Sequence, residues 1–257
     1  MNNNIFKFDK FTPIFTLVAK NEEELVETIA KYNYKNAIYE IRVDALLHYK
    51  NSVEDVIYII NNVISIFDDY KFLVTIRTKD EGGLIKLDHK EYFDIWWELF
   101  NKTSPQYMDI KYEIFKKDVR ALEYLRKVVD YNKTKVISSY HSFKKNFDIN
   151  ELSALIFDMI DNYGDIIKVA INTNDQHDLF MFMNFAHLIL DKLKSKNKEA
   201  IFIVMGEIGK LTRVWPEYTN SSYMFYKLYD DNKTKNIAGQ ITINELKALR
   251  EKIGLKD

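Results

Sequence analysis

The chain has 257 residues, of which 47% are hydrophobic, 29% are charged and none is cysteine, and its formal net charge is -1. The lack of cysteine excludes disulfides, thiolate metal sites and cysteine nucleophiles, and the balanced charge provides no basic surface for binding nucleic acid. No segment approaches the roughly 18 apolar residues of a membrane span, and residues 1–10 lack the apolar core of a signal peptide, so we expect a cytoplasmic protein without a membrane partner.

Short apolar segments alternate with longer amphipathic segments along the chain, a pattern typical of a parallel sheet with crossover helices. The predicted strands cover residues 13–18, 37–43, 72–77, 107–111, 135–140, 166–170, 200–205 and 222–228. The predicted helices cover residues 22–31, 53–67, 91–100, 119–129, 151–162, 178–193 and 244–252.

Eight strands that alternate with helices in a chain of this length favour a (β/α)8 TIM barrel, since such barrels fill about 250 residues as one domain. An open, doubly wound sheet is the alternative. No linker rich in proline or glycine divides the chain, so we predict a single domain over residues 1–257, with residues 1–10 as an N-terminal extension. Active sites of such barrels lie at the C-terminal ends of the strands.

The second and third predicted strands carry charged residues toward their C-terminal ends. Alternation along the second strand places Glu40, Arg42 and Asp44 on one face. Arg77 lies at the tip of the third strand, and Glu81 follows in a loop whose glycine pair allows a tight turn. Because arginine binds carboxylates bidentately and a glutamate accepts hydrogen bonds from hydroxyls, this pattern favours a small hydroxylated acid as ligand.

The sixth predicted strand contains a lysine, Lys168, in the middle of an apolar run. A strand this apolar is expected to be covered on both faces, and burial lowers the pKa of a lysine from its ordinary value of about 10.4. A neutral amine forms a Schiff base with a ketone, and His141, at the end of the preceding strand, can transfer a proton near neutral pH. The structural alternative is a strand-end lysine whose ammonium reaches water.

The last two strand–loop units add Arg213 and Gln240. A small, hydroxylated keto acid fits this set of residues better than a phosphosugar, because no glycine-rich phosphate-binding loop follows either strand. Each polar residue taken alone also has a structural explanation, as a surface ion pair, a helix cap or a core histidine.

Six motifs, in order, resemble those of type I 3-dehydroquinate dehydratase, a Schiff-base enzyme of the shikimate pathway of aromatic amino acid biosynthesis. They occupy residues 40–44 (Glu-x-Arg-x-Asp), 77–83 (Arg-x-x-x-Glu-Gly-Gly), 139–143 (Ser-x-His-x-Phe), 165–170 (Asp-x-x-Lys-x-Ala), 205–213 and 239–241. The resemblance implies a (β/α)8 barrel that works as a homodimer without cofactor or metal. Its implied substrate is the small molecule 3-dehydroquinate, from which it would remove water to give 3-dehydroshikimate, and it implies no nucleic-acid partner.

The resemblance also implies roles for individual residues. Lys168 would form the imine, His141 would move the proton and help the hydroxyl leave as water, and Glu81 would position His141. The substrate would be bound by Glu40, Arg42, Arg77, Arg213, Asn236 and Gln240, with Arg213 chiefly on the carboxylate.

One departure from the family pattern concerns the charge of the fourth strand. The pattern has an acidic residue two positions before a glutamate, and counting back from Glu113 gives Lys111. A cation that points inward there would lower the pKa of the neighbouring histidine and lysine. Asp109 and Glu113 are the two candidates to replace the missing acid.

Further departures lie near the predicted lid. Asn236 replaces a serine, Ala238 a proline and Asn220 a glycine. Two alternatives to the dehydratase therefore stay open: an inactive homologue that binds a keto acid or serves as a scaffold, and another class I lyase or aldolase on the same barrel.

Overall fold

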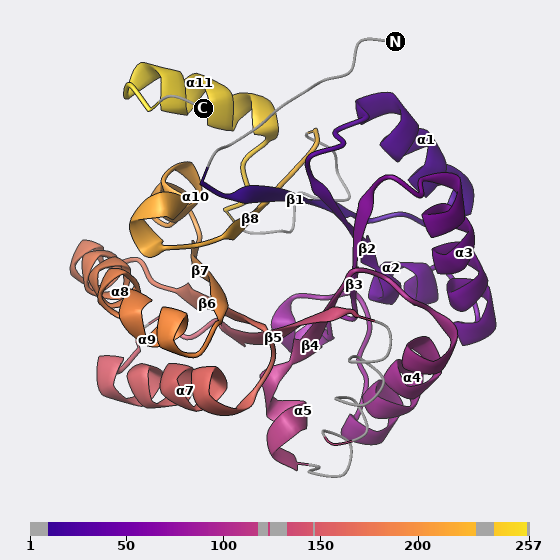
Figure 1. Ribbon diagram of the computed structural model, residues 1–257, viewed down its shortest axis with the longest axis horizontal. Helices are drawn as coiled ribbons and strands as arrows, with labels where there is room; N and C mark the ends of the chain where they lie inside the picture. Colours follow the sequence, from indigo (N-terminus) through magenta and orange to yellow (C-terminus); the bar gives the residue numbers. More distant parts are fainter. Residues whose placement is uncertain (1–9, 118–122, 124–132, 146, 230–238, 256–257) are drawn as a thin grey trace. The chain divides into compact units, whose positions relative to one another are not determined.

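The computed structural model describes residues 10–117, 123, 133–145, 147–229 and 239–255 (Figure 1). These residues belong to two compact units. The first unit contains Phe15–Val136, and the second contains Ile137–Asp257 together with the segment that ends at Ile14. That the chain is one domain stays a prediction.

Strands and helices alternate through the first unit. In chain order they are β1 (Thr12–Leu17, from Phe15 onward), α1 (Glu22–Tyr32), β2 (Ile38–Arg42), α2 (Val43–His48), α3 (Val53–Ile66), β3 (Lys71–Thr75), the 3-10 helix η1 (Lys79–Glu81), α4 (His89–Lys102), β4 (Tyr107–Lys111) and α5 (Tyr112–Lys117). Figure 1 shows α1, α3 and α4 side by side along one side of β2 and β3.

Side-chain caps determine where the long helices of this unit begin. Both α3 and α4 begin with a capping box, formed by Ser52 with Asp55 and by Asp88 with Glu91. A cap of this kind satisfies backbone N–H groups that have no partner within the helix, which stabilises the helix by about 1 kcal/mol. The caps therefore fix the ends of the two loops that lead into α3 and α4.

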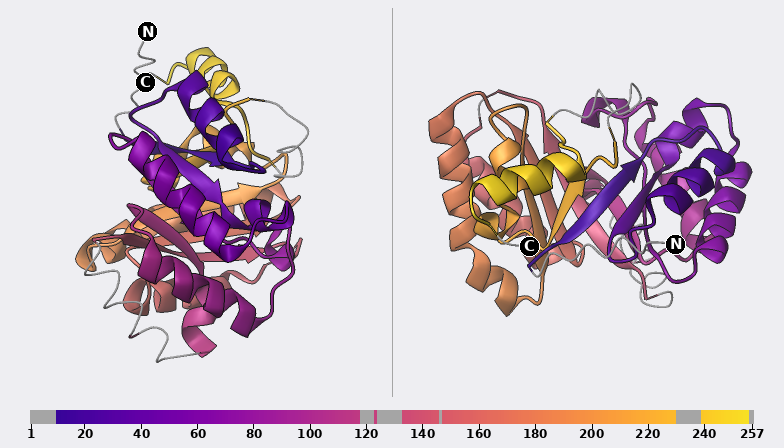
Figure 2. Two further views of the ribbon diagram at one scale, coloured as in Figure 1. Left: turned by 90° about the vertical axis from the view of Figure 1, so that its right-hand side faces the viewer. Right: turned by 90° about the horizontal axis from the view of Figure 1, so that it is seen from above.

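The second unit continues the same alternation. Its elements are β5 (Lys135–Ser142, from Ile137 onward), α7 (Ile149–Asn162), β6 (Ile166–Asn172), α8 (Gln176–Leu188), α9 (Leu190–Ser195), β7 (Glu199–Met205), α10 (Lys210–Val214), the 3-10 helix η2 (Pro216–Thr219), β8 (Tyr223–Tyr226) and α11 (Ile243–Lys252). The C-terminal helix α11 runs beside α10 (Figure 2), where the Arg250 guanidinium donates to the Val214 carbonyl oxygen over 3.0 Å.

The strand order identifies the fold class. The eight strands form one sheet in the order β7-β6-β5-β4-β3-β2-β1-β8, so consecutive strands of the chain are neighbours. The pairs β2–β3, β3–β4, β5–β6 and β6–β7 are parallel. A doubly wound sheet reverses its strand order at a switch point, and this sheet does not, so the alternative fold is excluded. The fold is the predicted (β/α)8 barrel.

Strand register gathers the polar side chains of neighbouring strands on a common face. In the first unit, Arg42 lies opposite Thr75, and Thr75 lies opposite Asp109. In the second unit, Ser139 lies opposite Lys168. Because side chains alternate along a strand, the residues between these positions face the helices, and they are apolar in β2, β3, β4 and β6. Each unit thus has one helix-facing apolar surface and one polar surface.

All eight predicted strands are present, with ends that differ from the predicted ones by at most two residues. Two boundaries matter for the site. Val43 and Asp44 begin α2 instead of ending β2, and β5 extends beyond its predicted end to include His141. Among the described residues, no helix is long and apolar enough to cross a membrane.

The helix predictions need one correction. The predicted helix 178–193 is two helices, α8 and α9, because the chain leaves the helical conformation at Ile189 (φ -85°, ψ 6°). Neither glycine nor proline marks this break, so the periodic pattern gave no sign of it. The predicted helix 119–129 lies outside the described residues except for position 123, and the short helices α2, α5 and α10 are below the length at which periodicity is recognisable.

Candidate active site

Asp44 joins the end of β2 to the segment that follows β3. Its fully buried carboxylate accepts hydrogen bonds from Nε and Nη2 of Arg42, both over 2.7 Å. It also accepts from the backbone N–H groups of Arg77, over 3.2 Å, and Leu84, over 3.1 Å. Burial lowers the pKa of Arg42, but the Asp44 carboxylate outweighs burial, and the pKa ends above its ordinary value. The Arg42 guanidinium is therefore charged and fixed in orientation.

Arg77 is the centre of a second buried charge cluster in the same unit. Its Nη1 donates to Oε1 of Glu81 over 3.0 Å, and its Nη2 donates to Oδ2 of Asp109 over 2.7 Å. Burial lowers the pKa of Arg77, but the charges of Asp109, Glu81 and Glu40 outweigh it and raise the pKa. Arg77 and the three acidic residues are each at least nine-tenths buried. The structure thus brings together four of the predicted site residues, Glu40, Arg42, Arg77 and Glu81, through Asp44 and Asp109.

The turn that carries Glu81 depends on a close approach of its backbone. Oε2 of Glu81 accepts a hydrogen bond from the Thr78 hydroxyl over 2.8 Å. Gly82 has a φ of 83°, which favours glycine. A Cβ on Gly83 would lie 1.7 Å from the Arg77 carbonyl oxygen, so no side chain fits there. The glycine pair therefore allows the chain to fold back so that Glu81 meets Arg77.

Lys168 is buried in the second unit, and the alternative of a lysine that reaches water is wrong. Lys168 is only 4% exposed, and its Nζ lies 3.9 Å from the ring centroid of Phe225 in β8. The face of an aromatic ring attracts a lysine ammonium and so restricts where Nζ lies. Lys168 is thus an amine held on the polar surface of β6, as predicted from the apolar run around it.

His141 shares that polar surface with Lys168. Ser139 of β5 lies opposite Lys168, and His141, two positions further on, lies opposite Ala170. Residues paired in this way point to the same side of the sheet. The other side of these strands faces α7. There, Tyr140 and Ile171 line a cavity of about 200 Å³ together with residues of α7. His141 and Lys168 therefore face away from α7, on adjacent strands.

Arg213 is a buried cation of α10 and is 3% exposed. Its Nη1 donates to the Phe225 carbonyl oxygen over 3.3 Å, and its own carbonyl accepts from the Tyr226 hydroxyl over 2.7 Å. Burial lowers the pKa of Arg213 to about 10, because Tyr226 offsets only part of the desolvation. Phe225 therefore contacts both Lys168 and Arg213, and an anionic group bound beside Arg213 would compensate its charge.

One of the departures from the family pattern, Asn220, falls on a described residue of the second unit. Asn220 has a left-handed φ of 54°, a conformation that glycine and asparagine adopt most readily. Its side-chain amide donates to the carbonyl oxygens of Ala186 and His187 over 3.3 and 3.1 Å. Asparagine therefore fits the position that a glycine would occupy.

The predicted lid is described only at its end. Gly239 (φ 74°) packs against the backbone of Gly206, since a Cβ on Gly239 would lie 2.7 Å from the Gly206 carbonyl oxygen. Gln240 follows and is half-buried. Asn236 and Ala238 lie outside the described residues.

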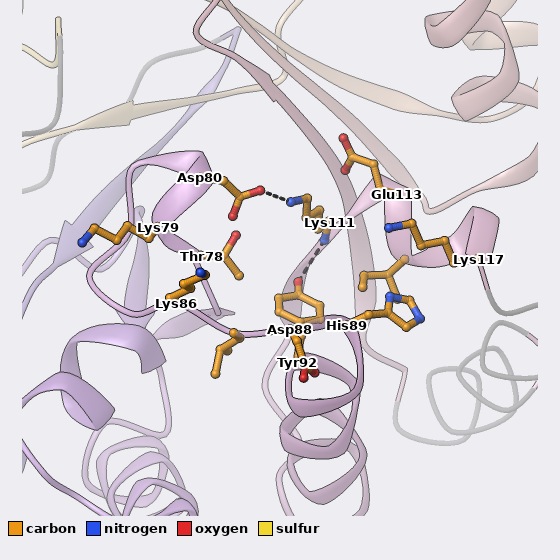
Figure 3. Close-up of a pocket in the computed structure, with 12 residues that line it drawn as sticks. Thr78, Lys79, Asp80, Lys86, Asp88, His89, Tyr92, Lys111, Glu113 and Lys117 are labelled. Carbon is orange, nitrogen blue, oxygen red and sulfur yellow. Dashed lines mark hydrogen bonds and ion pairs between the residues drawn. The ribbon is translucent and has the colours of Figure 1, made fainter.

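Lys111, the residue that breaks the charge pattern of the fourth strand, forms an ion pair with Asp80 in the first unit. Nζ of Lys111 lies 2.5 Å from Oδ2 of Asp80 (Figure 3). Both residues line a cavity of about 540 Å³ between the β3–α4 loop and the start of α5. Of the two candidates to replace the missing acid, Asp109 is the one that pairs with Arg77. Glu113 lines the cavity, and its Oε2 is buried without a hydrogen-bond partner.

The comparisons with known proteins agree with the architecture and the motifs. The sequence profile of the type I 3-dehydroquinase family matches residues 14–257. This chain belongs to the type I 3-dehydroquinase family.

Relatives within the family are distant in sequence. The chain is 30% identical over 241 residues to the catabolic 3-dehydroquinate dehydratase of Acinetobacter baylyi, a match that covers 91% of this chain and 84% of the relative. Among solved structures, it is similar to the type I 3-dehydroquinate dehydratase of Clostridium difficile with a TM-score of 0.79 at 20% identity, covering 95% of this chain and 92% of the other. The enzyme of Enterococcus faecalis gives a TM-score of 0.78 at 21% identity, covering 95% and 94%. These structures share its fold.

Phe225 is the buried residue of this type I 3-dehydroquinase family member that the sequence analysis did not name, and Asp44 was named there without a role of its own. Asp44 lies within the Glu-x-Arg-x-Asp motif, so its position there was a signal that could have drawn attention to it. Asp109 was one of the two candidates for the missing acid, but its pairing with Arg77 joins residues distant in the chain and has no sequence signal. The same holds for the contact of Phe225 with Lys168. Among the described residues, no group of three histidine or carboxylate side chains could hold a metal ion.

Proposed function

We propose that this protein is a 3-dehydroquinate dehydratase, which removes water from 3-dehydroquinate through an imine on Lys168. The observation that carries the proposal is the buried amine of Lys168 on the same strand surface as His141, within a chain of this family. A ketone-binding amine and a titratable imidazole are the two groups that such an elimination needs.

Lys168 supplies the covalent step. Its neutral amine adds to the ring ketone, and the loss of one water with the uptake of one proton from solvent gives a protonated imine. The imine draws electrons from the ring, so the C–H bond next to it becomes acidic. Burial of the amine supports this step, because desolvation favours the neutral, nucleophilic form of a lysine.

His141 carries the proton. The neutral imidazole takes the proton from the acidified carbon, and the electron pair of that C–H bond moves toward the imine nitrogen. The imidazolium then gives the proton to the departing hydroxyl, which leaves as water and creates the double bond of 3-dehydroshikimate. Hydrolysis of the imine returns the free amine and the product. We assign Glu81 an electrostatic role in these proton transfers.

Charged and polar residues hold the substrate in this proposal. Arg213 binds the carboxylate, which agrees with its lowered pKa, since an anion would stabilise the buried guanidinium. The hydroxyls and the remaining polar atoms are bound by Glu40, Arg42, Arg77, Asn236 and Gln240.

The proposal is tested by turnover of 3-dehydroquinate, followed through the absorbance of the conjugated enone product. Lys168→Ala, purified identically, is the blank, and Lys192→Ala is the matched control, because Lys192 forms an exposed ion pair with Asp161. Borohydride added during turnover should reduce the imine and leave a permanent adduct, which mass spectrometry would detect on the parent and on Lys192→Ala.

Each outcome separates the alternatives. Turnover and labelling that disappear only in Lys168→Ala support the dehydratase. Labelling without turnover points to an inactive homologue that still binds a keto acid. Neither turnover nor labelling in the parent would refute the proposal for this substrate.

A further inference from the structure

The 3-10 helix η1 holds Glu81 through a short and mostly exposed piece of chain. Inside the turn, Glu81 is held by the Arg77 guanidinium and the Thr78 hydroxyl. At its outer side, the preceding residue Asp80 has a side chain that is 67% exposed. Backbone hydrogen bonds close the turn on itself, from Gly83 N–H to the Thr78 carbonyl over 2.8 Å. Contacts from outside the turn fix where it lies, and the bond from the Leu84 N–H to Asp44 is one of them.

Lys111 provides such a contact from the end of β4. Its side chain is 18% exposed, and its ammonium pairs with the Asp80 carboxylate, 31 positions away in the chain. Figure 3 shows the two side chains pointing toward one another from the strand end and the turn. The backbone N–H of Lys111 separately donates to the Tyr92 hydroxyl over 3.0 Å. The strand end is thus anchored to α4 whatever side chain stands at position 111.

The charges around Lys111 strengthen this contact. Three carboxylates, those of Asp80, Glu81 and Glu113, surround its ammonium. Burial lowers the pKa of Lys111, but these carboxylates outweigh burial and raise it. Burial raises the pKa of Glu113, and Lys111 opposes that rise. The ammonium therefore neutralises a local excess of negative charge beside the turn.

We propose that Lys111 is a positioning residue, which through its ion pair with Asp80 holds the η1 turn and thereby sets the place of the Glu81 carboxylate. This inference rests on the proposed function, since it concerns the proton transfer in which Glu81 takes part. Lys111 has no contact with the reacting atoms in this proposal. Its effect on the reaction passes through Asp80 and the turn.

Steady-state kinetics of five variants test the proposal: Lys111→Met, Lys111→Arg, Lys111→Glu, Asp80→Lys and the double variant D80K/K111E. Lys111→Met should lower kcat roughly tenfold and leave KM within about twofold, because displacement of a catalytic group affects the chemical step more than binding. Lys111→Arg keeps the ion pair and should retain most of the parental kcat. The matched control is Lys90→Met, which removes an exposed ion pair with Asp94 on α4.

The charge swap separates positioning from a general loss of structure. Lys111→Glu and Asp80→Lys should each lower kcat, and D80K/K111E should recover it well above either single variant. Thermal unfolding midpoints of all variants show whether kcat falls without a matching loss of stability. Parental kcat in Lys111→Met, or a double variant no better than Lys111→Glu, would overturn the proposal. Failure of the proposed function itself shows differently, as a parent protein without turnover and without borohydride labelling at Lys168.

Discussion

Nζ of Lys168 lies 3.9 Å from the ring centroid of Phe225, so the candidate nucleophile rests against an aromatic face. The carbonyl of the same Phe225 accepts a hydrogen bond from Arg213. One residue of β8 therefore orients both the amine that would attack the ketone and the cation that would bind the carboxylate. A shift of β8 would change both at once.

Replacement of the Phe225 ring tests its hold on the amine. Phe225→Leu should lower kcat/KM roughly fivefold, since a contact between a lysine and an aromatic face is worth on the order of 1 kcal/mol. Borohydride labelling of Lys168 should slow in parallel. Phe202→Leu is the control, because Phe202 lies opposite Val169 and faces the helices. Equal losses of kcat/KM in the two variants would show that the ring of Phe225 has no special part.

Loss of the Asp44 charge should destabilise the first unit. Asp44→Asn leaves the buried Arg42 guanidinium without its carboxylate, and breaking a buried pair on one side costs about 3 kcal/mol. Urea unfolding should show that decrease in the free energy of unfolding, together with a higher KM. Asp94→Asn, at an exposed ion pair, should change it by less than about 0.5 kcal/mol. A fully stable Asp44→Asn would contradict the role that we give to this carboxylate.

A side chain at Gly83 should displace Glu81. In Gly83→Ala the new Cβ would meet the Arg77 carbonyl oxygen at 1.7 Å, so the turn must open and the Arg77–Glu81 contact must lengthen. We expect kcat to fall by roughly two orders of magnitude, as a shift of about 1 Å in a catalytic group can cause. Gly254→Ala, where the Cβ meets nothing within 4 Å, should keep the parental kcat. Near-parental activity of Gly83→Ala would mean that the turn tolerates opening.

Removal of the Arg213 charge should have opposite effects on binding and on stability. Folding lowers this pKa to about 10, so the unfolded chain holds the proton more tightly and the charge costs stability at all pH values below about 10. In the parent, the free energy of unfolding should therefore gain from this group only as pH rises above about 10. Arg213→Met should unfold no more easily than the parent at pH 7, while KM rises at least tenfold. A clear loss of stability with unchanged KM would contradict carboxylate binding by Arg213.

The fold was predictable because strand and helix patterns are local properties of the sequence. The apolar run around Lys168 predicted a strand buried on both faces, and β6 is buried along nearly its whole length. Local patterns fail where a contact with distant residues decides the outcome. Asp44 continues the alternation of β2, yet it lies in the first turn of α2, where its carboxylate binds Arg42 and the loop after β3. The break at Ile189 likewise has no local signal.

The sequence by itself determined which groups are available for the chemistry: a lysine in an apolar strand, a histidine after the preceding strand, and arginines and carboxylates at strand ends. Only the tertiary structure decided the partners of these groups. The charge of Lys111 departs from the family pattern, but in the structure Lys111 is paired with Asp80. From the sequence alone Arg77 could have paired with any carboxylate, whereas in the structure it binds Glu81 and Asp109. The reason is physical, because burial makes the free energy of a charge depend on the atoms packed around it, and residues far apart in the chain supply those atoms.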